Sequence, residues 1–331
     1  MDKDLAAIEQ EVKGLTLKLS DLKKEIGKVI IGQEETVDQL IITFLAGGHA
    51  LLEGVPGLAK TLMIRTLAET VDLKFKRIQF TPDLMPSDII GTEILEEDHT
   101  TGKKFFKFNK GPIFANIILA DEINRTPPKT QAALLEAMQE FEVTYSGNTY
   151  KLDRPFFILA TQNPIEQSGT FPLPEAQQDR FLFYIRIGYP TDSEEIAILK
   201  ATTGSKSEKP IKIISAEEII RLQELVREVP ISDDLISYVS KIVRATRPET
   251  TTNSYVKEWV SWGAGPRAGQ AIIVTAKARA LMQGRLAVTP EDLKHVAYPV
   301  LRHRVIVNFR AEAEGITTDK VTEELFKSIK L

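Results

Sequence analysis

The segment GVPGLAKT has the residue types of a loop that binds phosphate groups. Gly54 and Gly57 allow the backbone to bend around an anion, and the first N–H groups of a following helix would point at that anion. Lys60 would neutralise β- and γ-phosphate oxygens, and Thr61 would place its hydroxyl on Mg²⁺. Ala59 stands where the pattern GxxxxGK[ST] has a glycine, and a helical residue there can carry a methyl group. The pattern indicates triphosphate binding, with a random glycine-rich loop as the alternative.

Three polar residues follow two apolar segments further along the chain. Asp121 and Glu122 end the segment NIILADE, and Asn163 follows FFILATQ. Asp121 could hold the shell of Mg²⁺, Glu122 could polarise a water towards the γ-phosphate, and Asn163 could hydrogen-bond that water. Asp-Glu pairs are also common at solvated turns, and Asn before Pro is an ordinary turn residue. The phosphate-type loop upstream favours the functional interpretation.

Two arginines occupy positions suited to contact a γ-phosphate. Arg180 ends the segment PEAQQDR. It is either a surface arginine favoured by the helix dipole or an arginine finger that reaches the nucleotide of a neighbouring subunit. Arg267 lies near the N-terminus of a predicted helix, where a cation is disfavoured unless an anion is nearby. Arg125 and Arg186 are rival candidates for contacts between subunits. Whether Arg267 acts on its own nucleotide or a neighbour's stays open.

These side chains need strands that end at one edge of a sheet. Short apolar runs predict five buried strands. The runs are HALLE (49–53), FKRIQF (75–80), IILAD (117–121), FFILAT (156–161) and FLFYIRI (181–187). Helical patterns lie between them, at residues 60–70 and 128–140. This alternation predicts an α/β fold with a mostly parallel sheet, in which ligands bind beyond the carboxyl ends of the strands.

Other segments interrupt or extend this alternation. TEILEEDHTTGKKFFKFN predicts a hairpin that turns at residues 100–102, and FEVTYSGNTYKLDR predicts one that turns at 146–148. Either hairpin could contact a substrate or decorate the surface. Richness in Pro, Thr, Ser, Gly and Lys suggests a linker at residues 191–210, and helical patterns predict a second, smaller domain at residues 211–331.

The first segment, residues 1–28, predicts an amphipathic helix. Its apolar stripe consists of Leu5, Ile8, Val12, Leu15, Leu19, Leu22 and Ile26. Steps of three and four residues suit either a helix packed on the chain's own core or a coiled-coil seam. Gly14 and Thr16 would weaken an isolated helix, so packing on the core is favoured.

Composition narrows the classes of function. The 331 residues, 43% hydrophobic and 27% charged, suit a globular protein with a large core and a smaller domain. A net charge of −4 lacks the basic excess of nucleic-acid binders, so nucleic acid is an unlikely partner. There is no cysteine, and the four histidines show no ligand-type spacing. The first residues contain no apolar run of signal-peptide or membrane-span length, so we expect a cytoplasmic protein without membrane insertion.

Five motifs, in their order and spacing, resemble those of the MoxR family of AAA+ ATPases. They are GVPGLAKT, IILADEINR, ATQNP, EAQQDRF and GPRA. The resemblance runs from about Val29 to the C-terminus. Within it, VIIGQEETV resembles the segment that lines the adenine pocket. TPDLMPSDIIGTEILEE resembles the helix-2 insert, and FEVTYSGNTYKLDR the hairpin before sensor 1. Ala59 is usual in this family, whereas Gly265 stands where relatives often have Ser.

The resemblance implies a P-loop AAA+ core at residues 29–190, with a parallel five-stranded sheet between helices, followed by a smaller all-α lid domain. The implied catalytic residues are Lys60, Glu122, Asn163, Arg180 and Arg267. The implied metal-binding residues are Thr61 and Asp121. The implied nucleotide-binding residues are Ile30, Ile31, Gly32, Gly54, Val55, Pro56, Gly57, Leu58, Ala59, Lys60, Thr61 and Leu62.

The resemblance also implies ATP and Mg²⁺ as cofactors, with ATP bound between the subunits of a homo-oligomer, expected to be a hexameric ring. A chaperone-like role in maturing or activating partner proteins is implied, often proteins with a von Willebrand factor A domain. Metal insertion, as by the related magnesium chelatase motor subunits, is a close variant. Two alternatives stay open: a DNA-acting AAA+ motor or helicase loader, and a non-hydrolysing nucleotide switch or scaffold.

Overall fold

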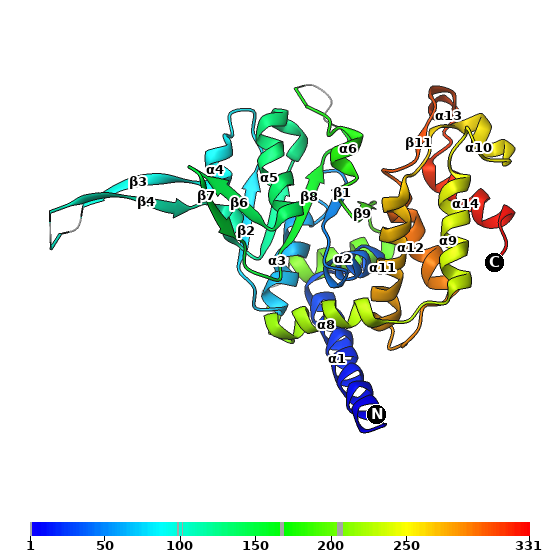
Figure 1. The fold of residues 1–331 in the computed structure, drawn as a ribbon, viewed down its shortest axis with the longest axis horizontal. Helices are drawn as coiled ribbons and strands as arrows, with labels where there is room; N and C mark the ends of the chain where they lie inside the picture. The colour runs from blue at the N-terminus through cyan, green and yellow to red at the C-terminus, as the bar shows by residue number, and fades with distance from the viewer. Residues whose placement is uncertain (1, 98, 101, 166–168, 204–207) are drawn as a thin grey trace.

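A five-stranded parallel sheet forms the centre of the computed structural model (Figure 1), which confirms the predicted sheet. Its strand order is β2-β5-β8-β1-β9. The strands are β1 (Ala50–Glu53), β2 (Phe75–Gln79), β5 (Ile117–Asp121), β8 (Phe157–Gln162) and β9 (Phe183–Arg186). The structure describes residues 2–97, 99–100, 102–165, 169–203 and 208–331, and for residues 2–9 it describes the backbone alone.

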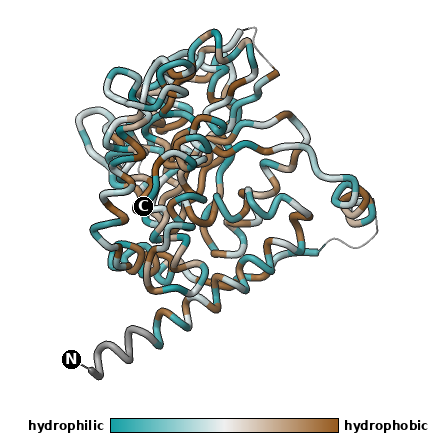
Figure 2. The backbone as a smooth tube through the Cα atoms, turned by 90° about the vertical axis from the view of Figure 1, so that its right-hand side faces the viewer, coloured by the Kyte–Doolittle hydropathy of each residue, from teal (hydrophilic) through white to brown (hydrophobic). Residues whose placement is uncertain are grey.

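Helices cover both faces of the sheet. The helices next to it are α1 (Asp2–Val29), α2 (Glu34–Leu45), α3 (Lys60–Thr70), α4 (Pro86–Ile90), α5 (Pro128–Glu140) and α6 (Glu175–Gln178), with the 3-10 helices η1 (Pro112–Phe114) and η2 (Ile123–Arg125). Alternate side chains of a strand face opposite sides, so Leu52 packs with α1, α2 and α3 while its neighbour Leu51 packs with α4 and α5. Figure 2 shows hydrophobic stretches gathered inside the molecule and hydrophilic ones on its outer turns.

The sheet brings the predicted motifs to one edge. Parallel register pairs Glu53 of β1 with Gln162 of β8, and Gln79 of β2 with Asp121 of β5. The backbone N–H of Gly54 then donates to the carbonyl of Gln162 at 3.3 Å. The loop after β1, the carboxylates after β5 and the residues after β8 therefore leave the sheet side by side.

The N-terminal helix α1 packs on the rest of the chain, as the sequence analysis favours. Leu19, Leu22 and Ile26 are buried in the same core as β1 and α3. The side chains of Leu5 and Ile8 lie outside the described part of the structure. Among the described helices, none combines the length and apolar character needed to cross a bilayer.

Two hairpins form where the sequence predicts them. β3 (Gly91–Glu97) pairs with β4 (Lys104–Lys110), and β6 (Glu142–Tyr145) pairs with β7 (Asn148–Lys151). The first projects from the body as a long arm (Figure 1). Its predicted turn includes residue 101, which lies outside the described residues. The second turns through Ser146 (φ 48°) and Gly147 (φ 80°), both in the left-handed region that tight hairpins need.

The predicted linker is not wholly irregular, because it contains helix α7 (Asp192–Thr202). Thr191 and Glu194 form a capping box: the hydroxyl of Thr191 accepts from the N–H of Glu194, and the Glu194 carboxylate accepts from the N–H of Thr191. A local cap therefore starts a helix in a segment whose composition suggests a loop.

The C-terminal part is helical, as predicted, but it is not all-α. Its helices are α8 (Ala216–Glu228), α9 (Asp233–Ala245), α10 (Ser254–Trp259), α11 (Pro266–Met282), α12 (Pro290–Leu301), α13 (Phe309–Ala313) and α14 (Thr318–Ser328). Between them, β10 (Val260–Trp262) pairs antiparallel with β11 (Ile306–Val307). The β-branched and aromatic residues of these two short segments suit an extended backbone, and pairing satisfies their backbone groups.

Candidate active site

The loop between β1 and α3 contains two residues in the left-handed region. Gly57 has φ 89°, and Ala59, which caps the N-terminus of α3, has φ 54°. The expectation of a helical Ala59 is therefore wrong, and this conformation costs an alanine about 1–2 kcal/mol. A Cβ on Gly57 would meet no atom within 4 Å, so open space lies in front of the loop. Strain of this kind is typical of functional sites.

The first residues of α3 face this open loop. The Lys60 ammonium donates to the carbonyl of Gly54 at 2.7 Å, so its side chain folds over the loop. The side chain of Ala59 makes no capping hydrogen bond at the N-terminus of α3, and the start of a helix favours an anion. Thr61 is half-buried beside Lys60. The other predicted contacts surround the same turn: Pro56 and Leu62 are exposed, and Val55 and Leu58 are half-buried.

The segment predicted to line the adenine pocket lies between α1 and α2. Ile30 is buried in the core, whereas Ile31 and Gly32 are partly exposed. Gly32 has φ 69°, and a Cβ there would lie 2.4 Å from the Glu194 carboxylate of α7. Gln33 donates from its side chain to the carbonyl of Gly188 at 2.9 Å. The segment is therefore tied to the chain that follows β9.

Asp121 is nearly buried and fixed from two sides. The Thr161 hydroxyl donates to its Oδ1 at 2.6 Å, and Arg77 on β2 forms an ion pair with its Oδ2 at 2.5 Å. The N–H of Glu122 donates to the same Thr161 hydroxyl at 2.9 Å. Thr161 on β8 therefore links both predicted carboxylate residues to the neighbouring strand.

The Glu122 side chain leaves the strand in a different direction. Its backbone has φ 58°, again in the left-handed region. The Gln79 amide donates to its Oε2 at 2.7 Å, and Arg125 pairs with the same oxygen at 3.2 Å. In this conformation the carboxylate is held through Oε2 by residues of β2 and η2.

Asn163 lies just past β8 and is 5% exposed. Its Oδ1 accepts from the backbone N–H of Ile165 at 3.2 Å, which is the local bond of a turn-forming asparagine. In this conformation Oδ1 of Asn163 therefore plays the part of an ordinary turn residue. The side chain nevertheless lies at the edge of the sheet that carries Asp121, because β8 is the direct neighbour of β5.

The donor set fits a magnesium–triphosphate complex. Mg²⁺ prefers oxygen ligands and is usually held by one or two side chains together with phosphate oxygens. The Thr61 hydroxyl and the Asp121 carboxylate supply hard oxygens, and the open loop at Gly57 leaves room for phosphates. Lys60 would exchange the Gly54 carbonyl for a phosphate oxygen.

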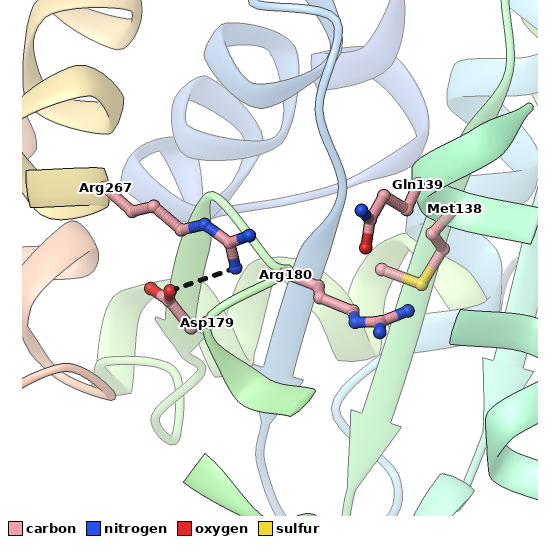
Figure 3. A pocket seen from close by; sticks show the side chains of 5 residues that line it. All are labelled: Met138, Gln139, Asp179, Arg180 and Arg267. Carbon is pink, nitrogen blue, oxygen red and sulfur yellow. Dashed lines mark hydrogen bonds and ion pairs between the residues drawn. The ribbon is translucent and has the colours of Figure 1, made fainter. Parts of the chain in front are cut away.

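Arg180 and Arg267 line a cavity of about 210 Å³ together with Met138, Gln139 and Asp179 (Figure 3). Arg180 donates to the carbonyl of Leu135 on α5 at 2.7 Å, whereas Arg267 of α11 pairs with Asp179 at 3.4 Å. The residues that line this cavity come from α5, α11 and the chain after α6, not from the phosphate-type loop. The two arginines therefore line one cavity, and Lys60 does not line it.

The rival arginines each contact a carboxylate of their own chain. Arg125 pairs with Glu122, and Arg186 on β9 pairs with Glu53 at 3.3 Å. Arg186 also lies over the Tyr184 ring, and burial together with the nearby Glu53 charge raises the pKa of Tyr184. These contacts do not decide whether Arg125 or Arg186 assists Arg180.

Several residues that hold the site escape the sequence analysis. They are Arg77, Gln79, Thr161, Asp179 and Arg304. The only signal for Arg77 and Gln79 is their alternation with Ile78 in FKRIQF, which puts both on one face of β2. That face meets Asp121 only because β2 is the neighbour of β5, and strand order is not written in the spacing.

Comparisons with known proteins agree with this arrangement. Residues 49–183 match the ATPase family associated with various cellular activities (AAA), and residues 253–325 match the AAA lid domain. Chaperone MoxR1 of Mycobacterium tuberculosis is 44% identical over 322 residues, which cover 96% of this chain and 84% of that protein. The uncharacterized protein YeaC of Bacillus subtilis is 42% identical, and the match covers 93% of each.

A solved structure gives the same result. A crystal structure of a candidate ATPase from Cytophaga hutchinsonii matches with a TM-score of 0.91 at 43% identity, covering 99% of this chain and 98% of that one. The resemblance drawn from the motifs is thereby confirmed. With an AAA core followed by an AAA lid, and with a relative that is 44% identical over 96% of the residues of this chain, the chain belongs to the MoxR family of AAA ATPases.

Proposed function

We propose that the chain hydrolyses ATP at a site shared between neighbouring copies of itself and uses the cycle for chaperone-like remodelling of partner proteins. The observation that carries the proposal is the meeting, at one sheet edge, of the phosphate-type loop with the carboxylate pair. Gly54 is bonded to the end of β8, and Thr161 of β8 is bonded to Asp121 and Glu122.

Each residue then has a defined task. Lys60 and the first N–H groups of α3 bind the phosphates, and Asp121 with Thr61 orients the metal. When bound, Mg²⁺ would be held by Thr61 and Asp121 and would neutralise the negative charge that develops on the phosphate oxygens. Glu122 accepts the proton of the attacking water after it leaves Gln79 and Arg125. The amide of Asn163 orients that water.

Arg180 completes the site of a neighbouring copy. Its place in a cavity apart from Lys60 supports action in trans, and a second cationic group at the γ-phosphate can raise turnover by roughly 10³-fold. Arg267 contacts the same cavity from the lid. The number of subunits, expected to be six in a ring, and a cytoplasmic location are parts of this proposal.

Glu122→Gln tests the hydrolytic role. The amide keeps the shape of the side chain but cannot accept the proton, so ATP should still bind while turnover falls by roughly 10²-fold or more. Binding is measured with a fluorescent ATP analogue, and turnover by phosphate release. Full turnover in this variant would remove Glu122 from its role, and ATP binding without turnover in the unmodified protein would support a nucleotide switch instead.

Mixing two inactive variants tests the shared site. Arg180→Ala keeps its own loop and carboxylates, whereas Glu122→Gln keeps its own arginine. Mixed assemblies should regain phosphate release, because some Arg180→Ala sites then receive an intact arginine from a Glu122→Gln neighbour. The absence of recovery at every ratio would refute action in trans.

The client is proposed to be a protein, and one with a von Willebrand factor A domain is the first candidate to test. Support comes from the similarity to Chaperone MoxR1 and from the arm β3–β4, which exposes Phe105 and Phe106. Glu122→Gln loaded with ATP should retain a client that the ADP form releases. Metal insertion into a client cofactor would appear as metal transfer in the same assay, and ATPase stimulation by DNA would support a DNA-acting motor.

A further inference from the structure

Three consecutive residues just after α12 donate hydrogen bonds to the chain segment that carries Arg180. Arg302 donates to the carbonyl of Tyr184 at 3.2 Å, and His303 donates from Nε2 to the carbonyl of Phe181 at 3.0 Å. Arg304 reaches the residues on both sides of Arg180. The lid is therefore bonded directly to residues 179–184, and not only through the backbone that connects lid and core.

Arg304 uses every N–H of its guanidinium. Nε donates to the Asp179 carboxylate at 2.7 Å. One terminal nitrogen donates to the carbonyls of Asp179 (3.2 Å) and Phe181 (2.7 Å), and the other to those of Leu182 (3.0 Å) and Val300 (2.8 Å). A planar fork with five satisfied donors fixes its partners in one geometry. Since the partners at 179, 181 and 182 flank Arg180, the fork fixes the backbone from which the Arg180 side chain extends.

The cost of burying this group argues against a purely structural reason for it. The Arg304 side chain is 4% exposed. Burial lowers the pKa of Arg304, and its hydrogen bond and charge pairing with Asp179 oppose that effect. Apolar residues of similar volume often stabilise a fold as well as a buried ion pair does. What apolar residues cannot supply is the defined orientation of five hydrogen bonds.

We infer that Arg304 is a positioning residue for Arg180, through which the orientation of one subunit's lid sets hydrolysis in the neighbouring subunit. The inference rests on the proposed function, because it needs Arg180 to act in trans. Asp179 strengthens the link, since its carboxylate also pairs with Arg267 on α11. Two lid elements thus hold the residue that precedes Arg180.

Arg304→Met tests the inference, because methionine fills the space but donates no hydrogen bond. The variant should bind nucleotide as the unmodified protein does, since its own loop and carboxylates are intact. Its turnover should fall by roughly tenfold to 10²-fold, as expected when a catalytic group is displaced by a fraction of an ångström to 1 Å. Phosphate release should rise again when Glu122→Gln subunits, which supply a correctly held Arg180, are mixed in.

Arg279→Met is the matched control. Arg279 is also a lid arginine, largely buried, and it pairs at 2.5 Å with a carboxylate, that of the buried Asp292. That pair lies between α11 and α12 and does not include the segment around Arg180. This variant should lower the unfolding midpoint but keep turnover close to that of the unmodified protein. An equal loss of turnover in both variants would mean that lid damage alone explains the effect, and would overturn the inference.

The mixing experiment separates the inference from the function on which it rests. If Arg180→Ala is rescued by Glu122→Gln and Arg304→Met is not, the shared site stands and the positioning role is wrong. If neither variant is rescued, the shared site is wrong and the inference fails with it. Arg304→Lys, which keeps the charge beside Asp179 but loses the fork, covers poor folding of Arg304→Met. It should show the same loss and the same rescue.

Discussion

Asp121 and Glu122 are adjacent in the chain, yet their side chains have separate surroundings. Asp121 ends β5 and is held by Thr161 and Arg77, whereas Glu122 turns into the left-handed region and is held by Gln79 and Arg125. The change in backbone conformation between them directs the two carboxylates apart. One carboxylate can therefore serve the metal while the other serves the water.

Gln79→Ala should raise basal ATP turnover. The Gln79 amide donates to Glu122 Oε2 at 2.7 Å, and a hydrogen bond to a charged group is worth about 1.5 kcal/mol. Its loss leaves Arg125 on that oxygen and makes it easier for the carboxylate to turn towards water. We expect phosphate release without client to rise roughly tenfold, which corresponds to that energy, with unchanged nucleotide affinity.

The double variant Gln79→Ala with Glu122→Gln is the control for this prediction. It should be as inactive as Glu122→Gln alone, because the added turnover still passes through the carboxylate. A fall in turnover in the single variant would show instead that Gln79 orients Glu122 for catalysis.

His49 makes the folded state sensitive to acid. Its Nδ1 accepts from the N–H of Ile158, and its Nε2 donates to the carbonyl of Met138, so only the neutral ring fits. Burial lowers the pKa of His49 from 6.5 to about 4. The unfolded chain therefore binds a proton that the folded chain does not, and stability falls as the pH drops from 6.5 to 4.

The loss of folding stability is about 3 kcal/mol. It is complete by about pH 4 and absent above pH 6.5. Urea unfolding of the unmodified protein and of His49→Gln at pH 7.5 and pH 4.5 measures it. The unmodified protein should lose more stability than the variant over this range. Equal losses would show that other groups account for the acid sensitivity.

The predictable residues of the site are those that belong to local motifs. Lys60, Thr61 and the carboxylate pair follow from a strand, a turn and a helix in sequence. Arg77 and Arg304 do not, because each meets its partner only through strand order or lid packing, 44 and 125 positions away in the chain. Local spacing carries no information on such contacts.

At the scale of elements, an aromatic cluster joins the two hairpins. Phe108 of β4 stacks on Tyr150 of β7 with ring centroids 4.4 Å apart and contacts Tyr145 of β6 at 5.1 Å. Phe114 of η1 completes the cluster at 5.9 Å from Phe108. The base of the long arm is thereby attached to the second hairpin, and we expect the two hairpins to move together.

Phe108→Ala should uncouple them. Each aromatic pair contributes about 0.5–1.5 kcal/mol beyond its buried area, so amides of residues 142–151 should exchange hydrogen faster in this variant. Phe106→Ala is the matched control, since Phe106 lies on the same strand but is 72% exposed. Faster exchange in both variants, or in neither, would contradict the coupling.

The elements themselves show where sequence patterns are sufficient. Residues 60–70 and 128–140 match α3 and α5 because each has a helical period with a turn or proline at its start. Residues 117–121 match β5 because they form a short apolar run. Helix α7 cannot be predicted in this way, because its composition resembles a loop and a single capping box starts it. The β10–β11 pair cannot either, because strands of two and three residues have no period to detect.

At the scale of the whole molecule, α1 connects the sheet with the lid. It packs against α3 on the sheet side and against α11 on the lid side, and one continuous hydrophobic core includes residues of all three helices. Leu22 lies within this core and is fully buried. Core and lid should therefore unfold together for as long as α1 stays in place.

Leu22→Ala tests this connection, and Leu17→Ala on the exposed side of the same helix, where Leu17 is 63% exposed, is its control. Removing a buried leucine costs about 3 kcal/mol, whereas the surface change should stay within about 0.5 kcal/mol. Both tryptophans, Trp259 and Trp262, lie in the lid, so fluorescence reports the lid while circular dichroism reports the whole chain.

In the unmodified protein and in Leu17→Ala the two signals should give one transition. In Leu22→Ala both should shift to lower denaturant together, since the cavity weakens a core that sheet and lid share. A shift seen by circular dichroism alone would mean that the lid folds independently of α1, and that the helix stabilises only the nucleotide-binding core.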